Sequence, residues 1–110
     1  MNKIVYLIVA NNQNYKIGIT TQRNLNRRIK TLQTGNSDKL EVVKTYPTNY
    51  ASLIERTLHR EFSTKKINGE WFNLSVSDVL TFEDKCRNIE NNINILKNQD
   101  NDYILKMLKI

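Results

Sequence analysis

Two short apolar runs decide how this chain folds: VYLI at residues 5–8 and YKIGIT at residues 15–20. Both are rich in β-branched and aromatic residues, and the polar turn NNQN at residues 11–14 separates them. Runs of this kind joined by a short Asn-rich turn are typical of an antiparallel hairpin. The first run is apolar on both of its faces, which indicates a strand with neighbours on either side.

The elements after the hairpin follow from periodicity and from residues that end helices. Leucine and isoleucine at positions 25, 29 and 32 recur at the spacing of one helix face, and Gly35 ends that helix. A third strand at residues 40–46 is expected to break at Pro47. A second helix then presents one apolar face, formed by Ala51, Ile54, Leu58 and Phe62.

Residues 65–69 are predicted to be a basic loop, and residues 70–74 a short last strand. The element order is therefore β-β-α-β-α-β. We predict an α+β fold with a small three- to four-stranded antiparallel sheet flanked by helices, followed by a helical extension at residues 76–110.

The C-terminal third carries apolar residues at steps of three and four, which is heptad spacing. After an interruption at Asp100 the register resumes. The seam consists of Val79, Phe82, Cys86, Ile89, Ile93, Leu96, Tyr103, Met107 and Ile110. This pattern predicts one long helix, or two helices divided near residues 98–102. The seam suits packing on the core and equally suits a homodimer, and the spacing leaves both open.

Charge is unevenly distributed along the chain. The formal net charge is +6, from 17 basic and 11 acidic residues. Residues 1–37 hold six basic residues and no acid, so the eleven basic and eleven acidic residues of the remainder cancel. A localised basic face suits a polyanion such as the phosphate backbone of DNA.

Length and composition exclude several classes of protein. A chain of 110 residues suits one domain with a single core. No apolar run reaches transmembrane length, and the N-terminus leads into a strand without signal-peptide character. The single cysteine, Cys86, excludes an intramolecular disulfide and a cysteine-based zinc site. An intracellular protein, in the cytoplasm or in a host cell if viral, is the resulting expectation.

The element order, with Tyr6, Gly18, Arg28 and Glu55 at their positions, resembles the GIY-YIG nuclease superfamily. The chain is most similar to the branch named after an open reading frame of phage T5. That branch characteristically carries Lys-Ile-Gly in the second strand and Gly-Glu-Trp-Phe in the last strand.

Both motifs are present here, at residues 16–18 and 69–72. The resemblance covers residues 3–75 and implies a nuclease domain at residues 1–75. The implied activity is that of a DNA endonuclease, which hydrolyses phosphodiester bonds with a single metal ion.

The resemblance also implies roles for the matched side chains. Tyr6 would lie by the scissile phosphate and deprotonate or orient the attacking water. Arg28 would stabilise the charge of the pentacovalent phosphate. Glu55 would bind one divalent cation, Mg²⁺ or alternatively Mn²⁺, which would stabilise the leaving 3′ oxygen. Gly18 would leave room for a close approach of backbone or phosphate.

Four further residues lie near these motifs, and two of them have more than one interpretation. Lys16 stands where the family more often has its second tyrosine; it is either a positive charge near the phosphate or a solvated surface lysine. His59, one turn from Glu55, is a candidate proton shuttle or a partner of Glu55, although a lone histidine is more often structural. Glu70 and Trp71 are expected to close the fold.

Basic residues outside this set are the candidates for DNA contact: Lys3, Arg23, Arg27, Lys30, Lys65 and Lys66. Three departures from the family pattern keep other functions open. Ile4 replaces the first glycine, Lys16 the second tyrosine, and Leu32 a histidine. One alternative is a DNA-binding module of the same fold with weakened catalysis. Another is a small dimeric adaptor or regulator organised by the C-terminal helix.

Overall fold

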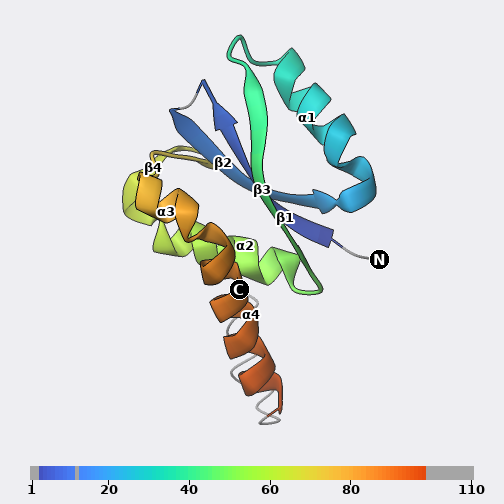
Figure 1. Ribbon diagram of the computed structural model, residues 1–110, viewed down its shortest axis with the longest axis vertical. Helices are drawn as coiled ribbons and strands as arrows, with labels where there is room; N and C mark the ends of the chain where they lie inside the picture. Colours follow the sequence, from blue (N-terminus) through green and yellow to red (C-terminus); the bar gives the residue numbers. More distant parts are fainter. Residues whose placement is uncertain (1–2, 12, 99–110) are drawn as a thin grey trace.

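The computed structural model describes residues 3–11 and 13–98 and shows an antiparallel five-stranded sheet with helices on both faces (Figure 1). The strands are β1 (Lys3–Ala10), β2 (Asn14–Thr21), β3 (Leu40–Thr48), β4 (Lys66–Asn68) and β5 (Trp71–Phe72). Their order across the sheet is β3-β1-β2-β5-β4. The predicted α+β class is confirmed, and β1 has a partner on each side, as its two apolar faces indicated.

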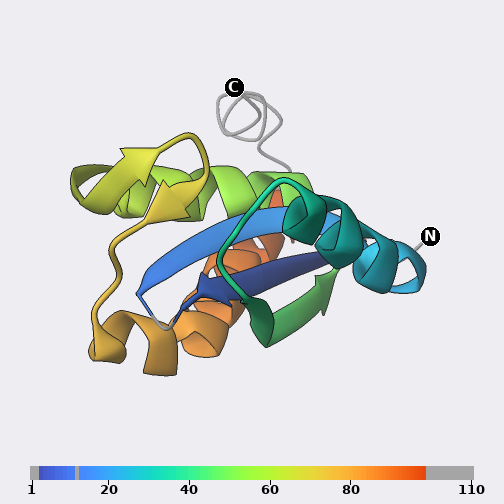
Figure 2. The same ribbon diagram turned by 90° about the horizontal axis from the view of Figure 1, so that it is seen from above.

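The described residues also form four α-helices and two 3₁₀ turns, and the last two helices follow the last strand. They are the turn Gln22–Asn24, α1 (Leu25–Thr34), α2 (Ala51–Glu61), the turn Ser63–Lys65, α3 (Val76–Leu80) and α4 (Phe82–Asn98). Helix α1 lies on one side of the sheet, and α2 and α4 lie on the other (Figure 2). The sheet therefore has two covered faces and two cores.

Alternate residues of β1 divide between these cores. Tyr6 and Ile8 point toward α1 and form a smaller cluster with Leu40. Val5 and Leu7 point the other way, into a larger cluster built with α2 and α4. This is the period-2 geometry of a strand that is buried on both sides. Any residue of β2 that faces Tyr6 consequently lies under α1.

Three predictions about the sheet are wrong, and two of them concern residues 65–74. The predicted basic loop at residues 65–69 contains strand β4, which pairs with β5 across a tight turn at Gly69. Gly69 has a positive φ of 52°, which glycine adopts readily. All three residues of β4 are exposed, so the strand leaves no alternating apolar pattern in the sequence. The last strand is shorter than predicted, because only residues 71–72 are paired as β5.

Pro47 does not break the third strand. Strand β3 runs to Thr48, and Pro47 stands opposite Ile4 of β1. A proline cannot donate a ladder hydrogen bond, but β3 is the outermost strand on its side of the sheet. Proline is tolerated there because its nitrogen can face away from the neighbouring strand.

The C-terminal seam packs on the core over the described residues. Phe82, Cys86, Ile89 and Ile93 of α4 are buried and belong to the larger core cluster. The division between helices falls at Thr81, between α3 and α4. The predicted division near residues 98–102 and the continued seam at Tyr103, Met107 and Ile110 lie outside the described residues. No helix among residues 3–11 and 13–98 is long and apolar enough to cross a membrane.

Candidate active site

The centre of the candidate site is the contact between Tyr6 and Gly18. The two residues are opposite each other in the β1–β2 register. A Cβ atom added to Gly18 would lie 2.4 Å from the hydroxyl oxygen and 2.5 Å from Cζ of Tyr6. The tyrosine ring therefore lies directly over the Gly18 backbone. Gly18 does provide room for a close approach, and in this structure the approaching group is Tyr6.

Arg28 reaches this tyrosine from α1. Its Nε lies 3.5 Å from the Tyr6 hydroxyl oxygen, the outer limit of a hydrogen bond in which arginine donates. This hydrogen bond is the main cause that raises the pKa of Arg28, so the guanidinium stays cationic. Arg27 is exposed on the helix surface. Of the two arginines, Arg28 is the one that approaches Tyr6.

Lys16 is buried beside the same pair, on the same face of β2 as Gly18. It is 7% exposed, and its Nζ lies 2.7 Å from Oε1 of Glu70. The ammonium also lies 5.7 Å from the ring centroid of Trp71, its partner in the β2–β5 pairing. A buried ammonium requires a charged or polar partner, which Glu70 supplies. Lys16 is therefore not a solvated surface lysine, and its charge is compensated within the chain.

Glu70 belongs to this cluster, although the sequence predicts only that it helps to close the fold. Its negative charge raises the pKa of both Arg28 and Glu55, so its carboxylate lies within electrostatic range of both side chains. The sequence feature that could have placed Glu70 in this cluster is the Gly-Glu-Trp-Phe motif itself. An antiparallel partner strand for residues 15–17 brings Glu70 next to Lys16.

Glu55 approaches the cluster from α2 and is partly buried. Burial is the largest cause that raises the pKa of its carboxyl group, and the charge of Glu70 raises it further. Electrostatic interactions with His59, Lys16 and Arg56 lower the pKa of Glu55. An ionised Glu55 is therefore held in an unfavourable environment, which a bound cation would relieve.

The donor set fits an oxygen-preferring divalent cation such as Mg²⁺ or Mn²⁺ more closely than Zn²⁺. In the part of the chain that the structure describes, no three or more His, Cys, Asp or Glu side chains are grouped closely enough to enclose a metal ion. Mg²⁺ commonly uses one or two carboxylates together with substrate phosphate oxygens and waters. Glu55 supplies a carboxylate of that kind.

His59 is fixed by contacts that tie α2 to the sheet. Its Nε2 lies 2.9 Å from the carbonyl oxygen of Ile17, so this nitrogen carries the proton and donates it. Its ring meets Phe72 edge-on, with centroids 5.0 Å apart. The ring is thus held between β2 and β5, and the proposed role as a proton shuttle would have to use Nδ1.

The predicted DNA-contacting residues lie in different environments. Arg23, Arg27, Lys30 and Lys66 are exposed on the first 3₁₀ turn, α1 and β4. The ammonium of Lys65 is paired with the carboxylate of Asp78 and lies over the ring of Phe62. Part of the predicted basic set is therefore already engaged within the chain.

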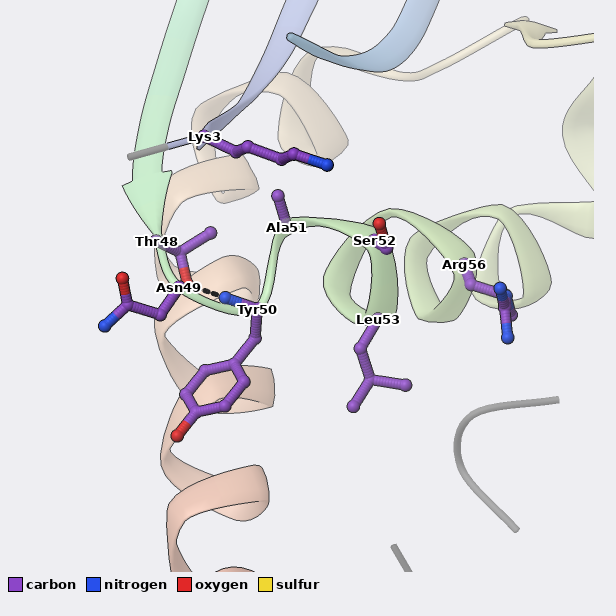
Figure 3. A pocket seen from close by; sticks show the side chains of 8 residues that line it. All are labelled: Lys3, Thr48, Asn49, Tyr50, Ala51, Ser52, Leu53 and Arg56. Atoms are coloured by element: carbon purple, nitrogen blue, oxygen red, sulfur yellow. Dashed lines mark hydrogen bonds between the residues drawn. The ribbon is translucent and has the colours of Figure 1, made fainter. Parts of the chain in front are cut away.

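Lys3 lines a surface pocket at the start of α2, where its side chain extends toward Ala51 (Figure 3). Ser52 and Arg56 line the same pocket. The lining includes none of Tyr6, Gly18 or Arg28. The candidate site is therefore a cluster on the sheet and two helices that lies outside this hollow.

A tyrosine over a strand glycine, with an arginine and a glutamate brought in from two helices, is the arrangement that the resemblance to GIY-YIG nucleases predicts. The model of the T5orf172 domain matches residues 3–88. The chain belongs to this family. Comparisons with curated proteins and with solved structures gave no significant match.

Proposed function

We propose that this chain is a metal-dependent DNA endonuclease that hydrolyses phosphodiester bonds with one divalent cation. The observation that carries the proposal is the convergence of Arg28 on Tyr6. It is joined by Glu55, a carboxylate within electrostatic range of Lys16 and Glu70 whose ionised form is disfavoured. A fixed guanidinium stabilises negative charge that develops on phosphate. A carboxylate whose ionised form is unfavourable is stabilised by a bound cation and is therefore suited to holding Mg²⁺.

In this mechanism Arg28 would bind a nonbridging oxygen of the scissile phosphate through its planar donors. Tyr6 would fix the direction of the guanidinium through its hydroxyl group. Glu55 would hold Mg²⁺, with Mn²⁺ as a possible substitute, and the ion would stabilise the leaving 3′ oxygen. The exposed basic residues of α1 would bind the DNA backbone on either side of the break.

The test is nicking of supercoiled plasmid by the wild-type protein with Mg²⁺ or Mn²⁺, compared with Glu55→Ala and Arg28→Ala. Both variants should lose cutting and keep salt-dependent DNA binding. Wild-type protein that binds DNA but does not cut with either metal would refute the enzyme proposal.

Metal binding has a readout that does not depend on activity. A ligand that binds only the folded state raises the Tm. Mg²⁺ should raise the Tm of the wild-type protein and leave that of Glu55→Gln unchanged. An equal rise in both proteins would mean that Glu55 is not the ligand.

A second candidate function is a DNA-binding module with weakened catalysis. Lys16, in the place of the second tyrosine, is engaged by Glu70, which favours this alternative. It predicts DNA binding by the wild-type protein that falls with salt, without metal-dependent cutting.

A further inference from the structure

The candidate site needs a group that accepts a proton from the attacking water. Tyr6 is poorly placed for this step, because its side chain is completely buried and its hydroxyl group lies beneath Arg28. His59 donates its Nε2 proton to the carbonyl oxygen of Ile17, which leaves only Nδ1, on a half-buried ring packed against Phe72. Glu55 is committed to the metal ion in the proposed function. Of the described residues in this cluster, Glu70 remains as an accessible acceptor.

We propose that Glu70 is the general base of this site and that Lys16 is the positioning residue that holds its carboxylate. This inference rests on the proposed endonuclease function. The side chain of Glu70 is 41% exposed, whereas that of Lys16 is 9% exposed. The buried ammonium of Lys16 therefore binds the Glu70 carboxylate from the protein interior. The rest of the Glu70 side chain is exposed to solvent.

The contacts of Glu70 leave one oxygen for water. Lys16 binds Oε1 at 2.7 Å, and this contact leaves Oε2 to accept a hydrogen bond. The backbone carbonyl of Glu70 accepts a hydrogen bond from the Ile17 amide at 3.3 Å, which fixes the residue against β2. The ring of Trp71, the next residue, lies 5.7 Å from the Lys16 ammonium. Backbone and side chain are thus both restrained, as an effective base requires.

The proton transfer balances without a further reactant. Oε2 of Glu70 takes a proton from water while the water oxygen forms a bond to phosphorus. The P–O3′ bond breaks, and the 3′ oxygen leaves with the electron pair and takes a proton from solvent. The products are a 5′-phosphate and a 3′-hydroxyl, and Glu70 returns its proton to solvent.

The test compares Glu70→Gln with the wild-type protein in plasmid nicking. Glutamine keeps the size and can still accept a bond from Lys16, but it cannot take a proton. Nicking should fall about 100-fold or more, the usual contribution of a general base. DNA affinity should stay close to the wild-type value, and the Tm should fall because the buried Lys16 ammonium loses its compensating charge. Glu41→Gln is the matched control, since Glu41 also pairs with a lysine, Lys39, but on the exposed surface of β3.

Two further variants separate catalysis from structure. Glu70→Asp should recover part of the activity because it keeps a carboxylate, and added formate should restore nicking by Glu70→Ala. Lys16→Arg should retain more nicking than Lys16→Met, and formate should rescue neither. If Glu70→Gln fails to fold, formate rescue of Glu70→Ala tests whether Glu70 is the general base.

The outcomes distinguish this inference from the proposed function. Nicking by Glu70→Gln within a few-fold of an active wild type, with Glu55→Ala inactive, would overturn the role of Glu70 alone. An absence of formate rescue in a folded, DNA-binding Glu70→Ala protein would do the same. A wild-type protein that never nicks DNA would overturn both proposals.

Discussion

The residue at position 18 determines whether Tyr6 can occupy its place in the site. The ring lies where a Cβ atom of any other residue would stand, with two of its atoms within 2.5 Å of that point. Contacts this short require the ring or the strand to move. The arginine that depends on the tyrosine hydroxyl would move as well. Gly18 is therefore a structural requirement of the site, even though it performs no chemistry.

Gly18→Ala should lower the free energy of unfolding by about 1–3 kcal/mol, the usual cost of overpacking. Gly35→Ala is the control, because a Cβ there meets nothing within 4 Å and its φ of −91° suits alanine. That change should be neutral or stabilise by up to about 1 kcal/mol. Urea denaturation measures both, and equal effects would contradict the packing argument.

Glu55→Gln should stabilise the protein at neutral pH. The folded pKa of Glu55 lies above its ordinary value of 4.5. Between the two values the folded state binds more protons than the unfolded state, so stability falls as pH rises through this window. Above this pH window the full free-energy cost of burying the ionised Glu55 carboxylate is present. Glutamine carries no charge and removes that cost.

The gain in Tm from Glu55→Gln should accordingly be largest near pH 7, should shrink as the pH falls through the raised folded pKa, and should be absent below 4.5. Thermal unfolding in metal-free buffer across this range measures it. Glu61→Gln, an exposed position on the same helix, serves as the control. A gain that does not change with pH would refute burial of charge as its cause.

At the scale of residues, the sequence indicates which side chains belong to the candidate site better than it indicates which of them contact one another. Tyr6, Arg28 and Glu55 are predictable because a motif marks each position. The Lys16–Glu70 pair is not, because it depends on a two-residue strand whose register no periodic pattern reveals. Burial of Lys16 follows from that same register.

At the scale of elements, α4 is part of the core. It contributes four buried residues to the larger cluster, and its Glu90 receives hydrogen bonds from Tyr46 and Thr48 at the end of β3. Burial, followed by the charge of Glu90, raises the pKa of Tyr46. The family match extends to residue 88, well into this helix.

Phe82→Ala should therefore cost about 3–5 kcal/mol of folding free energy, because Phe82 is completely buried. Leu80→Ala, two residues earlier, should change stability by no more than about 0.5 kcal/mol, since Leu80 is 72% exposed. Chemical denaturation of the two variants tests whether α4 is an integral part of the folded core. A small loss for Phe82→Ala would show that the helix is an appendage.

The elements that were predicted correctly have strong periodic patterns, as in α1 and β1. Strand β4 has none, because its three residues are all exposed; its signal was the Asn68-Gly69 turn. Pro47 was misread because sequence does not reveal which strand lies at the edge of a sheet.

At the scale of the whole molecule, the positive charge lies mainly in the first third of the chain. Arg23, Arg27 and Lys30 are exposed near the helix that carries Arg28. Residues at such positions can bind several phosphates without reading base sequence. DNA affinity should therefore depend strongly on salt and weakly on sequence.

Arg27→Gln should lower the slope of log K against log salt concentration by about 1, as expected for the loss of one phosphate contact. Lys39→Gln, which changes the charge equally at an exposed lysine paired with Glu41, should leave the slope unchanged. Fluorescence anisotropy at several salt concentrations measures both. Equal slopes for the two variants would mean that only net charge matters.

A homodimer is the other arrangement that the heptad seam suits. Because α4 supplies core residues, removing it would unfold the domain and would not report on association. The mass of the intact chain in solution is the better measurement. A monomer at every concentration tested would rule the dimer out.

Pro47 also limits how this sheet can grow. An exposed sheet edge is a template on which another chain can add a strand, and such addition is a common route to aggregation. Strand β3 is one such edge, and Pro47 offers an incoming strand no amide hydrogen. The residue that appears from sequence to interrupt the strand instead protects its outer edge from unwanted polymerisation.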